Sequence, residues 1–257
     1  MEQNNTLVSI ITPSYNCAAY IGKTIESVQA QHYQNWEMLI TDDGSTDNTQ
    51  EVVSEYARKD GRIKLLVLPQ RGGAGAARNN SIKEARGRYI AFCDADDSWL
   101  PEKLEKEIAL MQQKEAALVY GAYYECTKDL KRIRKVMVPE VLTFKSEKHV
   151  NQVGTLTAMY DAGKIGKQYM TLLQKRQDWA LWLQIMSTCK LAYGLQEPCA
   201  EYRLRPNSNS RNKMAMISFH AAVYEEVFHY PHWVALLYTL FVNIPAYLLK
   251  RIRVKRL

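Results

Sequence analysis

The sequence predicts an α/β fold with a mostly parallel sheet and flanking helices. Four apolar runs in the first half of the chain have the length and composition of buried strands, and stretches with helical spacing separate them. This alternation predicts βαβ units joined by right-handed crossovers. Ligands on such sheets bind beyond the carboxyl ends of the strands, so the polar residues there are the ones to examine for chemistry.

The expected strands are the runs LVSIIT, WEMLIT, IKLLVL and RYIAFC, at residues 7–12, 36–41, 63–68 and 88–93. Helical spacing follows the first two runs, at Tyr20, Ile21, Ile25 and Val28 and then at Val52, Val53 and Tyr56. With 257 residues, of which 47% are hydrophobic and 24% charged, the chain can bury a large core. It is expected to form one domain, or one domain with an appendage, and a disordered chain is excluded.

The five cysteines are scattered along the chain and form no CxxC pair. Their odd number and wide spacing argue against a disulfide framework and against a cysteine zinc site, and they fit a reducing cytosol. The first residues lead into a strand pattern without a basic stretch, so no secretory signal is expected.

The positive charge of the chain is concentrated at its end. The formal net charge is +7, and five of the basic residues lie within KRIRVKRL, residues 250–257. The main body is therefore not expected to bind nucleic acid. Residues 233–249 are apolar apart from a few polar positions such as Asn243, and Pro245 interrupts them. This length is near the lower limit for a membrane span, so we expect contact with an anionic membrane, the alternative being a terminal helix packed on the body.

Carboxylates gather after the fourth expected strand, where Asp94, Asp96 and Asp97 precede an aromatic residue. Ser98 or Asp97 could cap a helix that has Pro101 in its first turn, but a cap accounts for only one carboxylate. Three carboxylates at one sheet edge repel each other unless a cation is present, and their oxygens suit Mg²⁺ or Mn²⁺. Such an ion completes its shell with substrate phosphates, so the run predicts a metal that holds a diphosphate.

A second polar run, DDGSTD, follows the second strand. Ser45 or Thr46 could open the next helix, with Asp47 near its positive end. A cap leaves Asp42 and Asp43 unexplained, and Asp43 is placed to hydrogen-bond a base or ribose.

A dinucleotide-binding enzyme is a weaker alternative. Residues 73–78 nearly reproduce GxGxxG after a strand, and Asp94 follows at a suitable distance. However, Arg78 stands where close helix packing requires Gly or Ala, and residues 69–72 separate the strand from the glycines.

Taken together, the motifs resemble a known family. VSIITPSYN, ITDDGSTDNT, GGAGAARN and YIAFCDADDSW followed by LPEKLEKEI are similar to the nucleotide-binding half of the family 2 inverting glycosyltransferases, which have the GT-A fold. RQDWALWLQI (176–185) and AEYRLRPNSNSRNK (200–213) are similar to the acceptor half of bacterial members that build capsule or lipopolysaccharide glycans. The resemblance covers about residues 6–213.

The resemblance implies a domain organisation and a set of site residues. A GT-A domain over 1–213 would have a Rossmann-like nucleotide-sugar-binding half at about 1–115 and an acceptor half at 116–213, and 214–257 would form a helical, basic, membrane-associating tail. The nucleotide-binding residues would be Pro13, Tyr15, Asp42, Asp43, Arg78 and Asp94. Asp94 and Asp96 would form the DxD metal motif, with Asp96 as the direct ligand. The acceptor or diphosphate would contact Thr155, Trp179, Arg203 and Arg205.

The same resemblance makes Asp178 the catalytic base, next to Gln177 where the family usually has Glu. The residues alone favour a simpler role, because Asp178 precedes an apolar helical stretch and could cap it. Trp179 could stack on a sugar, although aromatic residues at helical spacing are more often core. Arg203 and Arg205 could equally belong to an ordinary surface loop.

The implied function is metal-dependent, inverting sugar transfer from a nucleotide-diphosphate donor, with UDP-sugars as the first choice. The implied acceptor is a hydroxyl of a glycan or lipid-linked acceptor in bacterial surface polysaccharide synthesis, at the inner face of the cell membrane, with Mn²⁺ or Mg²⁺ as cofactor. An alternative is a non-catalytic nucleotide-sugar-binding or membrane adaptor protein that has the same fold. The presence of Asp178 argues against that alternative.

Overall fold

A computed structural model of the protein describes residues 6–204, 213–250 and 254–256. The strands are β1 Val8–Ser14, β2 Trp36–Asp42, β3 Ile63–Val67, β4 Tyr89–Phe92, β5 Ser98–Trp99, β6 Leu118–Cys126, β7 Arg132–Val136, β8 Val141–Thr143, β9 Met159–Asp161, β10 Leu191–Arg203 and β11 Val254–Arg256. The helices are α1 Ala18–Gln29, α2 Thr49–Lys59, α3 Gly73–Glu84, α4 Lys103–Gln113, α5 Phe144–His149, η1 Thr155–Thr157, α6 Ala162–Ile165, α7 Gln177–Cys189, α8 Lys213–Phe228, α9 His232–Tyr238, η2 Thr239–Asn243 and α10 Ile244–Lys250.

The first half of the chain forms the expected parallel βαβ units. β1 pairs in parallel with both β2 and β4, and β2 pairs in parallel with β3. The four expected strands are confirmed, and their observed ends differ from the expected ends by two residues at most. The second half continues the sheet with antiparallel β9, β6 and β7, while β10 runs parallel to β6. The predicted α/β fold is therefore confirmed, with a parallel first half and a mixed remainder.

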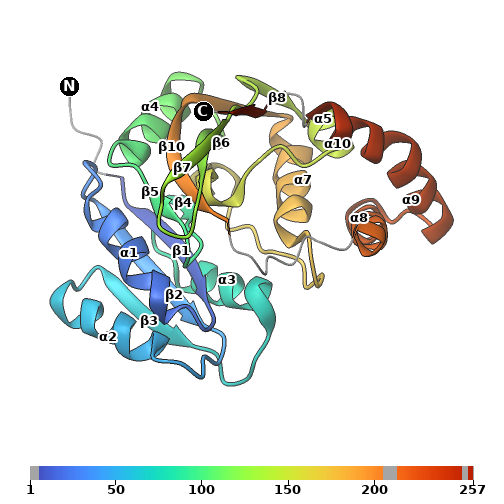
Figure 1. Ribbon diagram of the computed structural model, residues 1–257. Coiled ribbons are helices and arrows are strands. Elements are labelled where there is room, and N and C mark those ends of the chain that lie inside the picture. The colour runs from blue at the N-terminus through green and yellow to red at the C-terminus, as the bar shows by residue number, and fades with distance from the viewer. Residues whose placement is uncertain (1–5, 205–212, 251–253, 257) are drawn as a thin grey trace.

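Helices cover both faces of the sheet (Figure 1). One core cluster joins side chains of β1 and β2 to α1, α2 and α4. A second cluster, on the opposite face, joins the sheet to α3 and α7 and includes Trp182. Successive side chains along a strand point alternately to one cluster and to the other. Both faces of the sheet are buried, which explains why the strands are continuous apolar runs in the sequence.

The expected helix caps were wrong. α2 begins at Thr49 with Asn48 in the N-cap position, and α4 begins at Lys103 with Glu102 in that position. Ser45 does not open α2, because its backbone N–H and hydroxyl donate to the carboxylate of Asp42 and hold the loop against β2. Asp47, by contrast, lies near the positive end of α2 as expected, because its carboxylate accepts hydrogen bonds from the backbone N–H groups of Thr49 and of Ala18, the first residues of α2 and α1.

The helices after residue 213 pack against α7. A third cluster unites Trp179, Ala180 and Leu183 of α7 with Ala221, Val223 and Tyr224 of α8 and Ala235 of α9. In Figure 1, α8, α9 and α10 lie beside α7, at the opposite end of the molecule from α1 and α2. The chain end returns to the sheet, where β11 pairs with β7.

One helical stretch, His232–Leu249, is long and apolar enough by composition to cross a membrane, and 17% of its residues are buried. It comprises α9, the π-helical turn η2 and most of α10, so Pro245 does not end it. Proline lacks the N–H that a regular helix would use at this point, and a wider π turn just before it accommodates the lost hydrogen bond. Ala235, Thr239 and Asn243 are buried on its inner face.

Candidate functional site

The polar residues at the carboxyl ends of β1, β2 and β4 meet at one edge of the sheet. β1 lies between β2 and β4, so the strand order changes direction there. Pro13 is part of β1 and pairs with Thr41 of β2. In an open α/β sheet, such a reversal leaves a crevice beyond the strand ends in which ligands bind.

Asp42 organises the loops at this edge. Its carboxylate is fully buried and accepts hydrogen bonds from Ser14, Ser45 and Gln50. These donors satisfy both carboxylate oxygens from within the protein. Asp42 therefore holds the strand ends together and is not exposed at the surface where a nucleotide would lie.

Asp43 holds the start of α3. Its carboxylate accepts hydrogen bonds from the backbone N–H groups of Gly72 and Gly73, at 2.7 and 3.0 Å. Gly73 has a φ of +82°, a conformation that side chains disfavour, which explains a glycine there. The dinucleotide-binding alternative needs these N–H groups for a diphosphate, and here Asp43 occupies them.

Tyr15 and Arg71 cover Asp43. Tyr15 is 38% exposed, and the guanidinium of Arg71 lies over its ring, 4.0 Å from the centroid. Arg71 also approaches Asp43, with 3.8 Å between Nε and Oδ2. An exposed aromatic face beside a carboxylate suits a nucleoside, since the ring can stack on a base while the carboxylate accepts hydrogen bonds.

Arg78 and Asp94 form an ion pair near the edge of the sheet where the strand order changes direction. Nη2 of Arg78 donates to Oδ1 of Asp94 at 2.5 Å, and the side chain of Asp94 is 28% exposed. Arg78 extends from α3 and is buried, while its Nε has no hydrogen-bond partner among the residues that the structure describes. A buried guanidinium with an unsatisfied donor beside a carboxylate is suited to contact a phosphate.

The turn that follows Asp94 is tied to the end of β10. The backbone N–H of Arg203 donates to Oδ1 of Asp97, and its Nε donates to the carbonyl of Asp96. Arg203 is 5% exposed. Arg203 thus holds the acidic turn, residues 94–97, in place, while the side chain of Asp96 remains partly exposed. Arg205 lies outside the residues that the structure describes.

Several negative charges lie close together here. Burial, and then the nearby carboxylates of Asp97, Asp94 and Asp96, raise the pKa of the Tyr202 hydroxyl to about 12. A region in which three carboxylates disfavour another anion favours a cation. Among the described residues, no group of three or more His, Cys, Asp or Glu side chains forms a complete metal cage.

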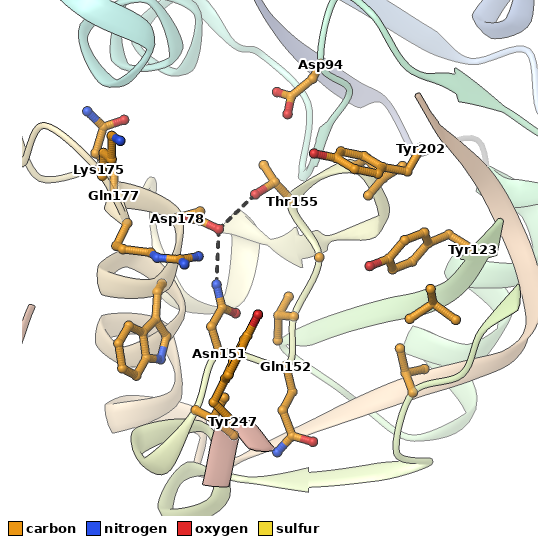
Figure 2. Close-up of a pocket in the computed structure, with 18 of the residues that line it drawn as sticks. Asp94, Tyr123, Asn151, Gln152, Thr155, Lys175, Gln177, Asp178, Tyr202 and Tyr247 are labelled. Carbon is orange, nitrogen blue, oxygen red and sulfur yellow. Dashed lines mark hydrogen bonds between the residues drawn. The ribbon is translucent and has the colours of Figure 1, made fainter. Parts of the chain in front are cut away.

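A cavity of about 510 Å³ extends from Asp94 and Arg78 toward the C-terminal helices. Figure 2 shows Asp94 at one end of it, Tyr247 at the other, and Asp178 and Thr155 between them. Tyr123 and Tyr202 line one side. The cavity therefore joins the acidic turn after β4 to residues of α7 and the C-terminal helices.

Asp178 faces this cavity from the first turn of α7. Its Oδ2 accepts hydrogen bonds from Asn151 Nδ2 at 3.1 Å and from Thr155 Oγ1 at 3.2 Å (Figure 2). Arg176 occupies the N-cap position with a left-handed backbone, and no side chain caps the helix. The capping interpretation of Asp178 is therefore wrong, because its carboxylate is held toward the cavity.

The neighbours of Asp178 are packed more tightly. Trp179 lines the cavity but is only 1% exposed, and its Nε1 donates to the carbonyl of Glu147. The side chain of Gln177 packs against Gly75 of α3. A Cβ atom at residue 75 would lie only 2.9 Å from the Gln177 side chain, so a larger residue would crowd it. Trp179 is thus largely core, and Gln177 joins α7 to α3.

Sequence reasoning missed several residues of the cavity. Asn151 and Gln152 come from the segment after α5, and His220, Asn243 and Tyr247 come from the C-terminal helices. Asn151 lies in no motif. Asn243 carried the clearest signal, because it is a lone amide in an apolar stretch, where a polar side chain requires a partner.

Solved structures with a similar fold support the architecture. The chain resembles TarS 1–349 of S. aureus in complex with UDP-GlcNAc, with a TM-score of 0.69 and 20% identity, over 89% of this chain and 69% of that chain. It also resembles the mannosyltransferase PcManGT from Pyrobaculum calidifontis in complex with GDP-Man and Mn²⁺, with a TM-score of 0.61 and 17% identity, over 96% and 73% of the two chains. At these identities the likeness establishes the fold.

Sequence comparisons identify the family. The chain is 40% identical to the teichuronic acid biosynthesis glycosyltransferase TuaG of Bacillus subtilis, over 86% of this chain and 88% of TuaG. It is 38% identical to the UDP-Glc:alpha-D-GlcNAc-diphosphoundecaprenol beta-1,3-glucosyltransferase WfgD of Escherichia coli, over 80% and 81% of the two chains. The profile named "Glycosyl transferase family 2" matches residues 9–168. The chain is therefore a glycosyltransferase and belongs to glycosyl transferase family 2.

Proposed function

We propose that the protein transfers a sugar from a UDP-sugar to a hydroxyl of a lipid-linked glycan acceptor, with inversion, in bacterial surface polysaccharide synthesis. One observation carries the proposal: Asp178 is held in the same cavity as Asp94 and Arg78. A carboxylate base and a phosphate-binding end in one cavity are what a single displacement requires. The names of TuaG and WfgD support the surface-glycan role.

Asp178 is the proposed general base. Asn151 and Thr155 hold Oδ2, whereas Oδ1 accepts no hydrogen bond from any residue in the described part of the chain. A base must present a lone pair within hydrogen-bond reach of the proton it removes. Oδ1 can thus accept the proton of the acceptor hydroxyl as that oxygen attacks the sugar carbon, and attack opposite the leaving diphosphate inverts the configuration.

Arg78 and the acidic turn are the proposed diphosphate end. The residues fit Mn²⁺ or Mg²⁺, because these ions use one or two carboxylates and complete their shells with phosphate oxygens. Asp96 and Asp94 would hold the ion, and Arg78 would pair with the phosphates once Asp94 turns to the metal. When bound, the metal stabilises negative charge on the leaving diphosphate.

Tyr15, Asp43 and Arg71 are the proposed nucleoside site. The exposed ring of Tyr15 would stack on the base, and Asp43 would accept hydrogen bonds from the base or ribose. The TarS complex with UDP-GlcNAc and the WfgD name support uridine as the base. The PcManGT complex with GDP-Man names another nucleotide that the same fold accepts.

The C-terminal helices are the proposed membrane contact. Trp233, Phe241 and Leu249 are 65%, 74% and 67% exposed, and the basic run at 250–257 follows them. Because the opposite face of the same stretch is packed on the body, we propose that it rests on the anionic cytoplasmic surface of the membrane. A lipid-linked acceptor would then stay in the membrane while its sugar enters the cavity.

A transfer assay tests the proposed function. The protein is incubated with a panel of UDP- and GDP-sugars, Mn²⁺, and an α-GlcNAc-diphospho-lipid with a short alkyl chain. We expect one donor to give a glycolipid one sugar larger, with the opposite anomeric configuration to the donor. A protein that binds nucleotide sugars but forms no product with any such acceptor would be the non-catalytic alternative.

A further inference from the structure

The C-terminal helices build the end of the cavity that lies farthest from the acidic turn. His220 of α8, Asn243 of η2 and Tyr247 of α10 line it, and Figure 2 shows Tyr247 opposite Asp94, with Asp178 between them. These residues lie beyond 9–168, the segment that the family profile covers. The wall of this end thus comes from a part of the chain that the family motifs do not describe.

Asn243 is fixed by two hydrogen bonds. Its Nδ2 donates to the carbonyl of His149 at 2.7 Å, and its Oδ1 lies 2.5 Å from Nδ1 of His220. A backbone carbonyl only accepts, so the amide orientation is determined and Oδ1 must face the histidine. Nδ1 of His220 therefore carries the proton, and Nε2 carries the lone pair.

His220 is neutral at physiological pH. Burial, and then the positive charge of Arg176, lower its pKa to about 4, against the opposing effects of Asn243 and Asp178. Its ring lies edge-on to Trp179, with 5.4 Å between the ring centroids. Within the described part of the chain, no group donates a hydrogen bond to Nε2. A fixed, neutral ring with an unused acceptor on a cavity wall is suited to bind a hydroxyl.

The π turn also determines where the side chain of Asn243 lies. Asn243 ends the π turn Thr239–Asn243 and is 1% exposed, although it lies in an otherwise apolar stretch. Single π turns commonly occur at functional sites, because they redirect side chains that a regular helix would place elsewhere. Burying an amide costs free energy unless it is hydrogen-bonded, and here the bonds position His220.

We propose that Nε2 of His220, with its tautomer fixed by Asn243, accepts a hydrogen bond from a hydroxyl of the acceptor sugar and orients that sugar against Asp178. The inference rests on the proposed function and adds the residue that determines which acceptor fits. Asn243 is a positioning residue that acts through His220. A sugar diphosphate has hydroxyls on both sides of its ring, so one can meet His220 while another meets Asp178.

The test compares His220→Phe with the wild type, with Ser218→Ala as a matched control at an exposed position on the same helix. Phe keeps a ring against Trp179 and removes the nitrogen. The donor is the UDP-sugar that the transfer assay identifies, and the acceptor is the α-GlcNAc-diphospho-lipid. We expect the acceptor KM to rise about tenfold, the worth of one hydrogen bond, while the Kd for UDP stays within about twofold.

A set of deoxy acceptors separates a direct contact from a general loss of fit. In the wild type, removal of the contacted hydroxyl should raise the acceptor KM about tenfold, whereas in His220→Phe the same removal should change little. His220→Gln, which retains an acceptor oxygen, should recover part of the lost affinity. If every deoxy acceptor affects the wild type and His220→Phe equally, the proposal is wrong.

Acceptor binding gives a readout that does not depend on turnover. The Kd of the α-GlcNAc-diphospho-lipid for the UDP-bound protein is measured by titration in the wild type and both His220 variants. If His220→Phe binds it as the wild type does, the proposal fails even where transfer succeeds. If the wild type binds it without transfer, the proposed function fails while weaker binding by His220→Phe still supports the contact. A wild type that does not bind it overturns the proposal for this acceptor class.

Discussion

Asp178 accepts a hydrogen bond from Asn151 Nδ2 at 3.1 Å, across 27 residues of sequence. This contact joins the first turn of α7 to the segment after α5, which no motif marks. A general base is effective only when its free oxygen points at the proton, and a carboxylate on the first turn of a helix could otherwise rotate. The hydrogen bond from Asn151 thus orients the Asp178 carboxylate in the cavity.

Asp178→Asn should lower turnover about 100-fold or more, because an amide keeps the size of the side chain but cannot accept the acceptor's proton. Donor affinity should persist, since Asp178 lies apart from Asp94, as Figure 2 shows. Initial rates and a titration with the UDP-sugar and Mn²⁺ check both statements. Normal turnover in this variant would remove Asp178 from the mechanism.

Among the described residues that follow α4, no carboxylate other than Asp178 lines the cavity. Asp161 pairs with Arg88, Glu201 pairs with Arg132, and Glu197 pairs with Lys106 on the surface. None of these carboxylates lines the cavity. Residual activity in Asp178→Asn is therefore expected to come from positioning alone.

Thr155→Val should lower kcat about threefold to tenfold, because the orienting hydroxyl at 3.2 Å from Asp178 is lost while the shape is kept. Thr155→Ser retains the hydroxyl and should stay near wild-type activity. The two variants are compared by initial rates at saturating donor and acceptor. Equal rates for the valine and serine variants would mean that Asn151 alone orients Asp178.

Asp96→Ala should weaken donor binding and transfer together, because the proposed metal would lose a ligand and the diphosphate its link to the protein. EDTA should abolish activity in the wild type, and Mn²⁺ or Mg²⁺ should restore it. Asp129→Ala, in the exposed turn before β7, is the matched control. Unchanged transfer in EDTA would contradict the metal proposal.

The sequence predicted the sheet and the residues at its edge for a simple physical reason. A strand buried on both faces is mostly apolar along its length, so the runs LVSIIT and RYIAFC can be recognised as strands from the sequence. Asp43 and Asp94 follow the strand ends directly, and parallel strands bring their carboxyl ends to the same edge. Local sequence therefore specified the parallel strands of the first half and the residues at their carboxyl ends.

The acceptor end could not be predicted in the same way. Asn151 and Asp178 meet only because α5 and α7 pack together, and His220 meets Asn243 only because α8 and η2 lie side by side. Such contacts depend on long-range packing, which no local pattern encodes. The expected cap at Ser45 was wrong for a different, local reason, since Ser45 donates to the carboxylate of Asp42 three residues earlier and so does not open α2.

The pKa of His220 predicts a pH-dependent stability difference. Its folded pKa of about 4 lies below its ordinary value of 6.5, so the unfolded chain binds this proton first as the pH falls. The stability contributed by neutral His220 is fully present above about pH 6.5 and is lost as the pH falls toward 4. The Tm of the wild type should therefore fall more between pH 7 and 5 than that of His220→Phe. Equal losses of Tm in both proteins would contradict this.

Phe241→Glu combined with Leu248→Glu should release the protein from anionic vesicles. Both side chains are exposed, at 74% and 57%, on the stretch whose inner face is packed on the body. Each apolar side chain buried in lipid contributes about 1.5–3 kcal/mol, so the double variant should bind about 100-fold less or weaker still. Co-sedimentation with vesicles of anionic lipid at low salt measures this.

Two comparisons make the vesicle result decisive. Val67→Glu places one of these added negative charges on an exposed apolar position of β3, at the opposite end of the molecule from α9, and should bind like the wild type, whereas each single variant, Phe241→Glu or Leu248→Glu, should bind more weakly. Binding of the wild type should also weaken as salt rises, because the basic residues at 250–257 are screened from the anionic lipids. Wild-type protein that stays in the supernatant at low salt would show that the exposed face of α9 and α10 does not contact lipid. If Val67→Glu releases the protein from the vesicles to the same extent, the exposed face of α9 and α10 is not the lipid contact. The release would then depend on the added negative charge and not on its position.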